Sequence, residues 1–338
     1  MSLYILQPGM QAMVQDLGRF GYQKYGVSPS GAMDLPAARI ANWLVGNKET
    51  EAVIELTYCG AKLKAERTLL LAVCGADMSA AVDGERLPLW RPVAVRAGST
   101  IHFGSNRAGC RAYIAIGGGI DVQPVLQSRS TYLRGELGGL QGRALQSGDR
   151  IELLSDDVKA STMQIKLLKR MKAGSSLSAS DWHADSAAYD GRHNPALIRV
   201  ITGKHFEWLT EKSKMELLYT AFKIGMQSDR MGSKVEGAAL QLERPIELLS
   251  EGVATGTVQL PPNGQPIILL ADRQTTGGYP RIAHVCAADL PKLAQLKPGD
   301  AFRFEFISQR EAESLLIKKE LELQQIKAAI ALKHLAMQ

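Results

Sequence analysis

Residues 251–281, EGVATGTVQLPPNGQPIILLADRQTTGGYPR, form the stretch around which the rest of the chain is organised. Within it, the apolar run from Ile267 to Ala271 is short, contains β-branched residues and is flanked by turn residues, which predicts a fully buried strand. The residues from Pro261 to Gly264 precede this run and predict a tight reversal of the chain. The sequence therefore predicts a hairpin whose second strand is buried.

A series of polar residues follows the predicted strand directly. They are Asp272, Arg273, Gln274, Thr275 and Thr276, and Gly277, Gly278, Tyr279 and Pro280 come next. A buried strand that ends in an acid, a base, an amide and two hydroxyls holds these groups at a rigid edge, where functional sites are usually built. Solvated residues of an ordinary turn are the alternative. Five polar groups in a row exceed what a turn needs, so we expect a functional site here.

Composition and charge exclude several classes of protein. A length of 338 residues fits two domains, and a hydrophobic content of 45% is normal for a globular protein. The net charge of +6 arises from interspersed acids and bases, so a nucleic-acid partner is not indicated. No stretch approaches the roughly 18 apolar residues of a membrane span, and the N-terminus lacks a signal-peptide pattern. We therefore expect no membrane association.

The cysteine pattern indicates a reducing compartment. Cys59, Cys74, Cys110 and Cys286 form no CxxC pair, and no histidine lies at zinc-ligand spacing from any of them. Cys74 and Cys286 lie in or beside apolar runs, which is typical of reduced core thiols. We expect a cytoplasmic protein without a metal site.

Most of the chain has the pattern of a β protein. Residues 52–154 read as short strands bounded by Gly, Asp or Asn, and strands return from residue 197, which favours a barrel or a sandwich. Residues 156–195 have little apolar periodicity and are expected to be a linker with at most a short strand. One helix before the tail is clear, because Asp34 is a good N-cap and Pro36 fits the first turn.

Two pairs of segments resemble each other within the chain. LQSGDRIELLS (145–155) resembles LKPGDAFRFEFIS (296–308), and VIELTYCG (53–60) resembles PIELLSEG (245–252). Two similar β units are the favoured interpretation, and a chance recurrence of Gly-Asp turns is the alternative. The predicted division is a first β unit at 1–158, a linker at 159–195, a second β unit at 196–308 and a C-terminal helix at 309–338.

The tail is expected to be one long helix. It contains no glycine or proline, and Leu316, Leu323, Ile330 and Met337 recur every seven residues. A coiled coil is one reading of this repeat. Packing against the body of the protein is favoured, because lysines such as Lys319 interrupt a paired seam.

Common catalytic motifs are missing from the sequence. It contains no P-loop, no HExxH, no GxSxG and no GxGxxG that opens a helix. The histidines are scattered: His102 and His284 fall in expected strands, and His183, His193 and His205 are expected in loops or at the surface. These patterns leave no standard nucleophile or metal centre.

Clusters of charged residues, hydroxyls and glycines remain. They are Gln15-Asp16 with Arg19, Ser30 to Asp34, Arg129-Ser130-Thr131, Ser228 to Gly232, and the stretch after Ala271. Arginines beside hydroxyls and glycine backbones suit carboxylate or phosphate oxygens, because a guanidinium donates two parallel hydrogen bonds. Each cluster alone is explained by an ion pair that fixes a loop. Together they favour a shared pocket.

The motifs that contain these clusters resemble the biotin-dependent carboxyltransferase-like family. They are VQDLGRFGYQKYGVSPSGAMD, GGGIDVQPVLQSRST, SDRMGSKVEG and GTVQLPPNGQPIILLADRQTTGGYPRIAHV, within about residues 3–308. The family includes the C subunit of bacterial ATP-dependent 5-oxoprolinase, the Kip antagonist protein, subunit 2 of allophanate hydrolase and part of the carboxyltransferase domain of urea carboxylase. The resemblance implies a mainly β fold of two tandem cyclophilin-like β-barrel units, here followed by a C-terminal helix.

The resemblance also implies a function. The leading hypothesis is the C subunit of a multisubunit hydrolase that opens 5-oxo-L-proline to L-glutamate with ATP, together with a companion B subunit, which binds it, and with a lactam-hydrolase A subunit. A Kip-antagonist-like regulatory protein that binds a Kip-inhibitor-like partner is one alternative. A carboxyltransferase component for urea or a related amide is another. Biotin would arrive on another chain, because no Met-Lys-Met carrier run is present.

Site residues follow from the leading hypothesis. Asp272 is the acid–base candidate, and Arg230 and Arg273 are expected to hold a carboxylate or a developing phosphoryl charge. The substrate-binding candidates are Gln259, Gln274, Thr275, Gly278 and Tyr279 from the second unit, and Arg19, Asp34, Arg129 and Ser130 from the first.

Overall fold

The computed structural model describes residues 2–154, 158–185 and 195–336. The chain divides into two compact units, and neither is contiguous in sequence. Unit 1 comprises Met1–Arg19, Asp34–Asp190 and Glu322–Gln338, and unit 2 comprises Phe20–Met33 and Gly191–Leu321. The four-part division expected from the sequence stays a prediction.

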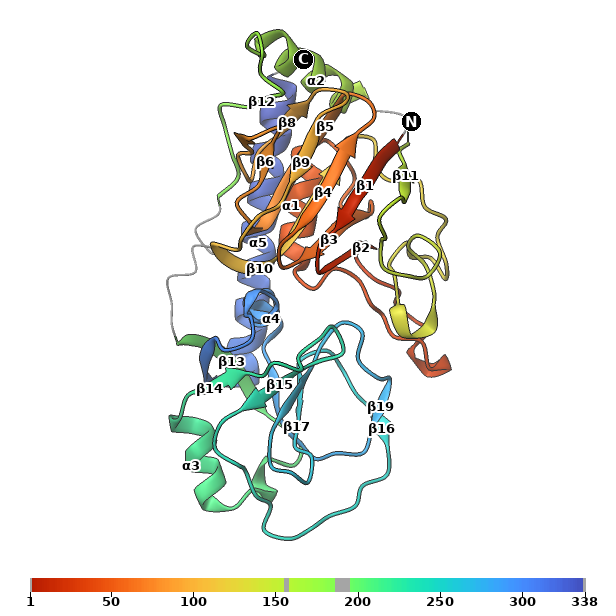
Figure 1. Ribbon diagram of the computed structural model, residues 1–338. Helices are drawn as coiled ribbons and strands as arrows, with labels where there is room; N and C mark the ends of the chain where they lie inside the picture. The colour runs from red at the N-terminus through yellow and green to blue at the C-terminus, as the bar shows by residue number, and fades with distance from the viewer. Residues whose placement is uncertain (1, 155–157, 186–194, 337–338) are drawn as a thin grey trace. The chain divides into compact units, whose positions relative to one another are not determined.

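Unit 1 is built from two six-stranded antiparallel sheets (Figure 1). In order across the first sheet, the strands are β11 (Arg150–Glu152), β1 (Ser2–Pro8), β4 (Ala61–Ala65), β9 (Thr100–His102), β6 (Ala81–Val82) and β7 (Glu85–Arg86). In order across the second, they are β12 (Leu177–Ala179), β8 (Val93–Val95), β5 (Leu69–Asp77), β10 (Ala108–Ile116), β3 (Val53–Thr57) and β2 (Gln11–Gln15). These sheets confirm the prediction of short strands over residues 52–154.

Both sheets contribute to one apolar core. Leu63 and Ile101 from the first sheet and Ile54 and Val73 from the second belong to the same buried cluster. In β4 the sequence AKLKA alternates between buried and exposed positions, as expected of a strand with one face in the core. In β5 the apolar run is buried along almost its whole length, because helices α1 (Leu35–Leu44) and α2 (Val158–Arg170) contact this strand in addition to the core.

The first helix has the predicted start. Helix α1 spans Leu35–Leu44, and the Asp34 carboxylate accepts a hydrogen bond from the Ala37 amide at 3.1 Å. The capping bond satisfies one of the amides that lack a partner within the first turn. Proline in this first turn removes another unsatisfied donor, so the sequence fixes where the helix begins.

The expectation that residues 156–195 contain at most a short strand is wrong. Helix α2 covers Val158–Arg170. Strand β12 (Leu177–Ala179) is the short strand that the sequence predicts. Met163 and Leu167 are buried and four residues apart, which places both on one face of the helix. Two buried positions in a polar segment are too few to give a clear helical period, and tertiary packing of this narrow face decides the structure.

Unit 2 is a closed seven-stranded barrel (Figure 1). Around the barrel, the strands are β13 (Ala196–Thr202), β20 (Arg281–Val285), β17 (Thr257–Gln259), β18 (Ile267–Leu269), β15 (Gly232–Glu236), β14 (Phe222–Ile224) and β21 (Ala301–Phe306). A separate ribbon pairs β16 (Glu251–Gly252) with β19 (Thr276–Gly277). The short helices are α3 (Glu211–Tyr219) and α4 (Leu290–Gln295), with single turns η4 (Phe206–Trp208) and η5 (Ala287–Asp289). The barrel is confirmed. The predicted strand is present as β18, but it ends at Leu269 rather than at Ala271, and Ile267 is only half-buried.

Residues 20–33 belong to unit 2 although they are far from it in sequence. The Ser28 hydroxyl donates to the Ala271 carbonyl at 3.0 Å, and the Ser30 amide donates to the same oxygen at 3.2 Å. Met33 is part of the buried cluster inside the barrel. This segment is therefore attached to the end of β18, directly before the predicted site.

The Gly-Asp turns of the internal repeat have matching geometry in the two units. In unit 1, Ile5 exchanges backbone hydrogen bonds with Gly148 and Asp149, both at 2.9 Å. In unit 2, Ile224 exchanges the equivalent bonds with Gly299 and Asp300, at 2.8 and 3.1 Å. Each aspartate side chain also accepts from the amide three residues earlier. This part of the repeat is a shared structural feature rather than a coincidence of sequence.

The second proposed similarity has no such counterpart. VIELT at 53–57 is a buried strand, β3, whereas residues 245–250 form no strand and are half-buried or exposed. The isoleucine and leucines of the two segments therefore occupy different environments. A match of three consecutive letters, Ile-Glu-Leu, was too short to imply the same structure.

The tail forms a single long helix, as predicted. Helix α5 spans Gln309–Leu335, and Leu323 and Ile330 are buried whereas Leu316 is 48% exposed. Within unit 1, the Lys327 ammonium lies 5.4 Å from the centre of the Trp43 ring and 3.7 Å from the Glu49 carboxylate. Packing against the body is thus confirmed for this part of the helix. Met337 lies outside the described residues.

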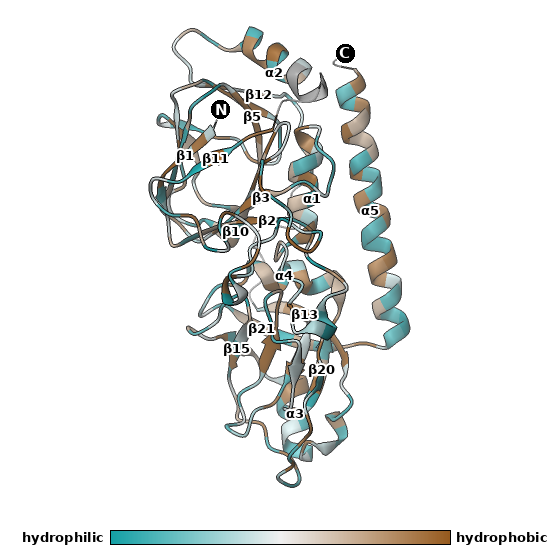
Figure 2. Ribbon diagram, turned by 90° about the vertical axis from the view of Figure 1, so that its right-hand side faces the viewer, coloured by the Kyte–Doolittle hydropathy of each residue, from teal (hydrophilic) through white to brown (hydrophobic). Residues whose placement is uncertain are grey.

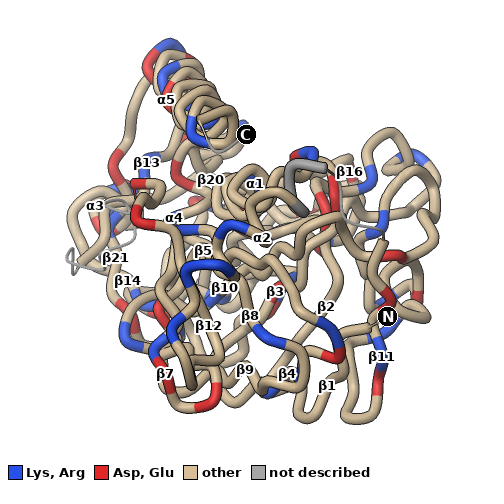
Figure 3. The backbone as a smooth tube through the Cα atoms, turned by 90° about the horizontal axis from the view of Figure 1, so that it is seen from above, with Lys and Arg blue, Asp and Glu red and all other residues tan. Residues whose placement is uncertain are grey.

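The surface character of α5 is mixed. Polar and apolar residues alternate along it (Figure 2), and it carries charges of both signs (Figure 3). Acidic and basic residues are interspersed elsewhere in the chain as well (Figure 3). Among the described residues, none of the helices combines the length and the apolar character needed to cross a bilayer.

Candidate functional site

An arginine and an aspartate meet at the end of β18. Strands β15 and β18 are antiparallel neighbours, with Gly232 opposite Leu269. Arg230 lies two residues before β15 and Asp272 lies three residues after β18, so this register brings them together. The Asp272 amide donates to the Arg230 carbonyl at 2.9 Å, which continues the pairing beyond the strands.

The two side chains form a buried bidentate ion pair. Arg230 Nε lies 2.8 Å from Asp272 Oδ2, and Nη2 lies 3.1 Å from Oδ1. Arg230 Nη2 also donates to the Gly31 carbonyl at 2.6 Å. Both residues are only 4% exposed. Parallel hydrogen bonds fix the two planar groups relative to each other, so the pair presents a rigid charged edge.

Arg273 has a different environment. Its guanidinium donates to the Val253 carbonyl at 3.2 Å, to Thr255 Oγ1 at 2.8 Å and to Gln23 Oε1 at 3.1 Å. These acceptors are all neutral, and burial lowers the pKa of Arg273 below that of a free guanidinium. No carboxylate among the described residues forms an ion pair with it. Arg273 is therefore a buried cation whose charge is not neutralised by a carboxylate.

Gln23 is a residue of this region that the sequence did not identify. It lies in the turn η1 (Gln23–Tyr25), and its amide Nε2 donates to the carbonyls of Val253 and Thr275 at 2.8 and 3.0 Å. Its role depends on contacts with residues more than 200 positions away. Only the position of Gln23 within a motif shared with the family could have indicated it.

Two predicted glutamines form a pair. Gln274 Nε2 donates to Gln259 Oε1 at 3.2 Å, and Gln259 is 1% exposed. The buried Gln259 Nε2 has no hydrogen-bond partner among the described residues. A Cβ added to Gly277 would lie 2.4 Å from this nitrogen, so glycine is needed for the close approach. The pair offers an amide donor that nothing in the described structure satisfies.

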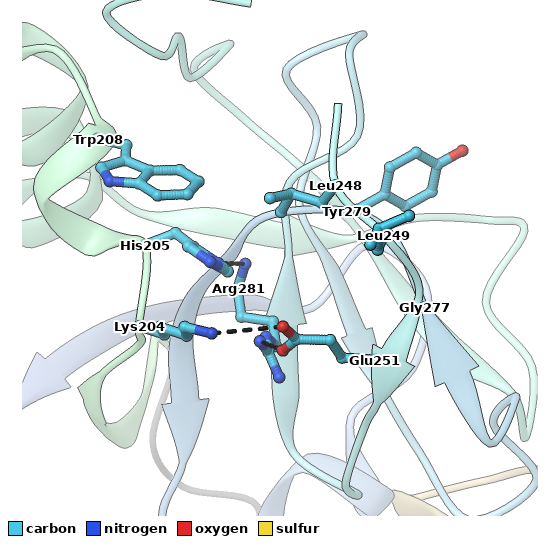
Figure 4. A pocket seen from close by; sticks show the side chains of 9 residues that line it. All are labelled: Lys204, His205, Trp208, Leu248, Leu249, Glu251, Gly277, Tyr279 and Arg281. Atoms are coloured by element: carbon cyan, nitrogen blue, oxygen red, sulfur yellow. Dashed lines mark hydrogen bonds and ion pairs between the residues drawn. The ribbon is translucent and has the colours of Figure 1, made fainter. Parts of the chain in front are cut away.

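A pocket of about 330 Å³ lies beside these residues in unit 2 (Figure 4). It is lined by Lys204, His205, Trp208, Leu248, Leu249, Glu251, Gly277, Tyr279 and Arg281. Tyr279 is the predicted binding residue among them, and Gly278 adjoins it in sequence. Figure 4 shows the Trp208 and His205 rings on one side, with Tyr279 and the two leucines on the other.

His205 lies in a turn, as predicted, but it is not at the surface. It is 3% exposed, its Nδ1 accepts a hydrogen bond from the Arg281 amide at 2.9 Å, and its ring lies 4.2 Å from that of Trp208. Burial lowers the pKa of His205, and the charges of Arg281 and Lys204 lower it further against the smaller effect of Glu251. The imidazole is thus neutral near pH 7. His183 is exposed as predicted, and His193 lies outside the described residues.

Three charged residues form a linked group at the pocket. Glu251 makes an ion pair with Arg281 and another with Lys204 at 3.4 Å. Hydrogen bonds from Arg281 first, and from Lys204 second, lower the pKa of Glu251. Two cations and one anion leave the pocket with one positive charge in excess.

In unit 1, three of the predicted residues gather around Asp16. Its carboxylate accepts hydrogen bonds from the Ser128 and Ser130 hydroxyls at 2.7 and 2.5 Å and from the Arg129 amide at 2.6 Å. Arg19 is 1% exposed and donates to the Val125 and Ser130 carbonyls at 2.9 and 2.8 Å. These bonds close a loop, as expected if each cluster alone serves to fix the local structure.

The other contacts of the first-unit candidates are also local. The Arg129 side chain donates to the Val122 carbonyl at 3.1 Å and lies 3.7 Å from Glu51. Asp34 is fully buried, caps α1, and its amide donates to the Tyr113 hydroxyl at 2.8 Å. The role of Arg19, Asp34, Arg129 and Ser130 in substrate binding stays a prediction.

Within residues 2–154, 158–185 and 195–336, His, Cys, Asp and Glu side chains do not gather in a group of three or more that could hold an ion. We therefore assign no residue of the site to a metal.

The chain is similar over nearly its whole length to the C subunit of 5-oxoprolinase from two bacteria. It is 35% identical over 326 residues to the protein of Haemophilus influenzae, covering 96% of this chain and 98% of that one. It is 36% identical over 310 residues to the protein of Escherichia coli, covering 92% and 93%. The two relatives thus correspond to this chain almost end to end.

The chain is also similar to parts of much larger yeast enzymes. It spans 17% of the urea amidolyase of Saccharomyces cerevisiae, with 30% identity over 93% of its own length. The solved structures of urea amidolyase and urea carboxylase from Kluyveromyces lactis each match 96% of this chain with a TM-score of 0.84, at 29% and 28% identity. The chain covers 20% and 29% of those two proteins.

A family model confirms the relationship that the motifs indicated. The model described as carboxyltransferase domain, subdomain A and B, matches residues 25–306. This range contains β18, the Arg230–Asp272 pair and the barrel of unit 2. With a match over most of its length, the chain belongs to the carboxyltransferase domain, subdomain A and B, family.

Proposed function

We propose that the chain is the C subunit of an ATP-dependent 5-oxoprolinase, which opens 5-oxo-L-proline to L-glutamate together with its companion A and B subunits. The observation that carries this proposal is the similarity, over more than nine-tenths of each chain, to two proteins named as the C subunit of 5-oxoprolinase. The larger urea enzymes match only through a small part of their length. This difference favours the separate subunit over a domain of a longer enzyme.

The reaction needs an activated amide. One water adds across the C–N bond of the lactam, the nitrogen becomes the amine of glutamate, and ATP hydrolysis with a second water supplies the driving force. Negative charge develops on the lactam oxygen as the carbonyl carbon becomes tetrahedral. Fixed donors that are aimed at this oxygen lower the barrier, because they need no reorganisation during the reaction.

We assign the charge-stabilising role to the two buried arginines. Arg273 has only neutral acceptors, so its positive charge remains available to a developing anion. Arg230 is held by Asp272 and by the Gly31 carbonyl, which fixes its direction. A guanidinium that is already in place avoids the cost of ordering a flexible side chain.

Asp272 is the proposed acid–base residue. Each of its carboxylate oxygens accepts one hydrogen bond from Arg230, which occupies only part of the acceptor capacity of a carboxylate. The remaining lone pairs can accept a proton from the attacking water, and the carboxyl group can then donate it to the lactam nitrogen, which leaves as the amine. The Gln259–Gln274 pair would orient the amide through the unsatisfied Gln259 Nε2.

The remaining assignments belong to the same proposal. Thr275, Gly278 and Tyr279 would contact the substrate from the stretch that follows β18. Arg19, Asp34, Arg129 and Ser130 would act from unit 1, where their local bonds hold them in defined positions. ATP is assigned to the complex rather than to any residue of this chain. We place the complex in the cytoplasm, in keeping with four free cysteines.

Reconstitution tests the proposal. The chain is purified, combined with candidate A and B subunits from the same organism, and supplied with 5-oxo-L-proline and ATP. We expect glutamate release that requires ATP and all three chains. Glutamate release at an undiminished rate without this chain would contradict the proposal. Omission of either companion provides the matched control.

Carboxyl transfer to urea or a related amide is the second candidate. The observation in its favour is the TM-score of 0.84 to urea carboxylase over 96% of this chain. In that case biotin would be carried by another chain. Carboxylation of urea in the presence of a carboxylated biotin carrier, with no release of glutamate from 5-oxo-L-proline, would favour this second function.

A further inference from the structure

The pocket of unit 2 has the properties of a ligand site. A volume of about 330 Å³ is at the lower end of the range for small-molecule pockets. Its walls combine the indole of Trp208 and the ring of Tyr279 with a few charged groups (Figure 4). Gly277 on its wall packs against Gln259, so the pocket adjoins the candidate site.

The neighbouring rings of His205 and Trp208 determine which uncharged part of a ligand fits the pocket. Because His205 Nδ1 accepts the Arg281 amide hydrogen, the proton of the neutral imidazole is on Nε2. Among the described residues, this Nε2–H has no hydrogen-bond acceptor. A ligand that lies along the Trp208 indole can thus use a flat apolar surface and, beside it, a neutral N–H donor. This combination suits a planar group that carries a carbonyl oxygen.

The charged group defines the second requirement. Arg281 is 21% exposed at its side chain, and its partner Glu251 is 51% exposed. A solvent-exposed carboxylate is held weakly, so a ligand carboxylate can replace Glu251 as the partner of Arg281. Lys204 is 65% exposed and pairs with the same Glu251 carboxylate. The excess of one positive charge favours a monoanion.

We propose that this pocket is a binding subsite that adjoins the Arg230–Asp272 reaction site and is separate from it. It binds a small planar monocarboxylate, with the carboxylate on Arg281, the planar part on Trp208 and a carbonyl oxygen on His205 Nε2–H. The proposal rests on the proposed function in one respect: 5-oxo-L-proline, a five-membered lactam with one carboxylate, is the member of this class that the complex would use. Glu251 occupies the position of the ligand carboxylate when no ligand is bound.

Direct binding to the full-length chain tests this proposal without turnover. Calorimetry measures the affinity for 5-oxo-L-proline, and fluorescence reports contact with Trp208, which is the single tryptophan of unit 2. We expect saturable binding with a change in emission. Two analogues serve as probes: 2-pyrrolidinone lacks the carboxylate, and L-proline lacks the lactam carbonyl. Both should bind at least about 10-fold more weakly, since each loses a hydrogen bond to a charged or buried group.

Variants of the charged group make the test specific. Arg281→Gln should weaken binding about 10-fold, because it removes a charge-assisted hydrogen bond. Arg303→Gln is the matched control, since Arg303 is exposed on β21 and does not line the pocket. Glu251→Gln should tighten binding, because the competing carboxylate is lost. A misfolded variant would not produce this gain.

The outcomes separate the pocket from the proposed function. Absence of saturable binding, or equal affinity in Arg281→Gln and Arg303→Gln, overturns the pocket assignment even if the complex turns over. Binding that follows the predicted pattern supports the assignment even if the reconstituted complex releases no glutamate, and in that case only the proposed function fails.

Discussion

Two neighbouring arginine environments in unit 2 differ in how charge is balanced. Arg230 has the Asp272 carboxylate at 2.8 Å, whereas Arg273 has a carbonyl, a hydroxyl and an amide oxygen. Burial, followed by the charge of Arg273, lowers the pKa of His284. An unneutralised buried cation is costly unless its hydrogen bonds are complete. The position of the Arg273 cation, next to Asp272 in sequence, favours a role in binding a negative charge.

The buried histidines predict a pH dependence of stability. Folding lowers the pKa of His205 and of His284, so the folded chain binds these protons less readily than the unfolded chain. The two neutral histidines therefore contribute fully to the free energy of unfolding above the unfolded-state pKa of about 6.5. This contribution is lost as the pH falls through their lower pKa values in the folded chain. We expect the urea midpoint to decrease between about pH 7.5 and pH 5.5, where histidines titrate.

A variant identifies the histidine responsible. His205→Asn removes a titrating group and retains a side-chain oxygen that can accept the hydrogen bond from the Arg281 amide. The decrease of the urea midpoint at low pH should therefore become smaller. His183→Asn is the control, because His183 is exposed. An identical pH dependence in all three proteins would show that His205 is not protonated differently in the folded and unfolded states.

Gly277 gives a second prediction at the scale of single residues. In Gly277→Ala, the new methyl group would meet the end of the Gln259 side chain, which is flexible. We expect a stability loss of less than about 1 kcal/mol, because the glutamine can move, and a clear rise in KM for 5-oxo-L-proline in the reconstituted complex. In Gly252→Ala, in the paired strand β16, the new methyl group would lie 3.9 Å from Gln23 Nε2, an ordinary contact, so KM should stay unchanged. Equal KM values in the two variants would argue against a role for Gln259 in binding.

At the scale of elements, strand register explains the site. Neither Arg230 nor Asp272 lies in a strand, yet the pairing of β15 with β18 continues into both residues. Residues 20–33 are fixed to the same strand end by bonds to the Ala271 carbonyl. One short buried strand thus holds an ion pair and a distant loop in place.

Helix α5 gives a prediction at this scale. Ile330 is 5% exposed and Leu332 is 67% exposed, although both lie in the same turns of one helix. Ile330→Ala should lower the free energy of unfolding by about 2–4 kcal/mol, because it leaves a cavity. Leu332→Ala should change it by less than about 0.5 kcal/mol. Urea unfolding of the two variants measures the difference, and similar losses would contradict the assigned packing face.

At the scale of the whole molecule, much of the fold could be predicted from local patterns. The cap at Asp34 and the apolar run of β18 are local signals, and each produced the expected element. The Gly-Asp turns revealed the repeat because a turn is fixed by few residues. Helix α2 was missed because two buried side chains decide it, and the attachment of residues 20–33 to unit 2 has no local signal.

The candidate site was predictable only in part for the same reason. Arg230, Asp272 and Arg273 stand out as charged residues beside a buried strand. Gln23 and His205 do not, because their contacts depend on how β13, β20 and the β16–β19 ribbon are placed around the barrel. The charge balance at Arg281 also requires Glu251, thirty residues away in sequence.

We propose that the Arg230–Asp272 pair serves catalysis rather than folding alone. Unit 2 contains a matched pair for comparison: Asp289 is fully buried and accepts hydrogen bonds from Arg199 at 2.8 and 2.6 Å. Both Asp272→Asn and Asp289→Asn replace one carboxylate oxygen of a buried bidentate pair. Each should cost stability, so activity is compared at a temperature at which both variants remain folded.

The decisive measurement is ATP-dependent glutamate release from 5-oxo-L-proline by the reconstituted complex containing each variant. We predict that Asp272→Asn lowers kcat by at least about 100-fold, as expected for a lost acid–base group, and that Asp289→Asn retains nearly the original kcat. Equal activity of the two complexes, whether both are active or both are impaired to the same degree, would contradict a catalytic role for the pair at the end of β18.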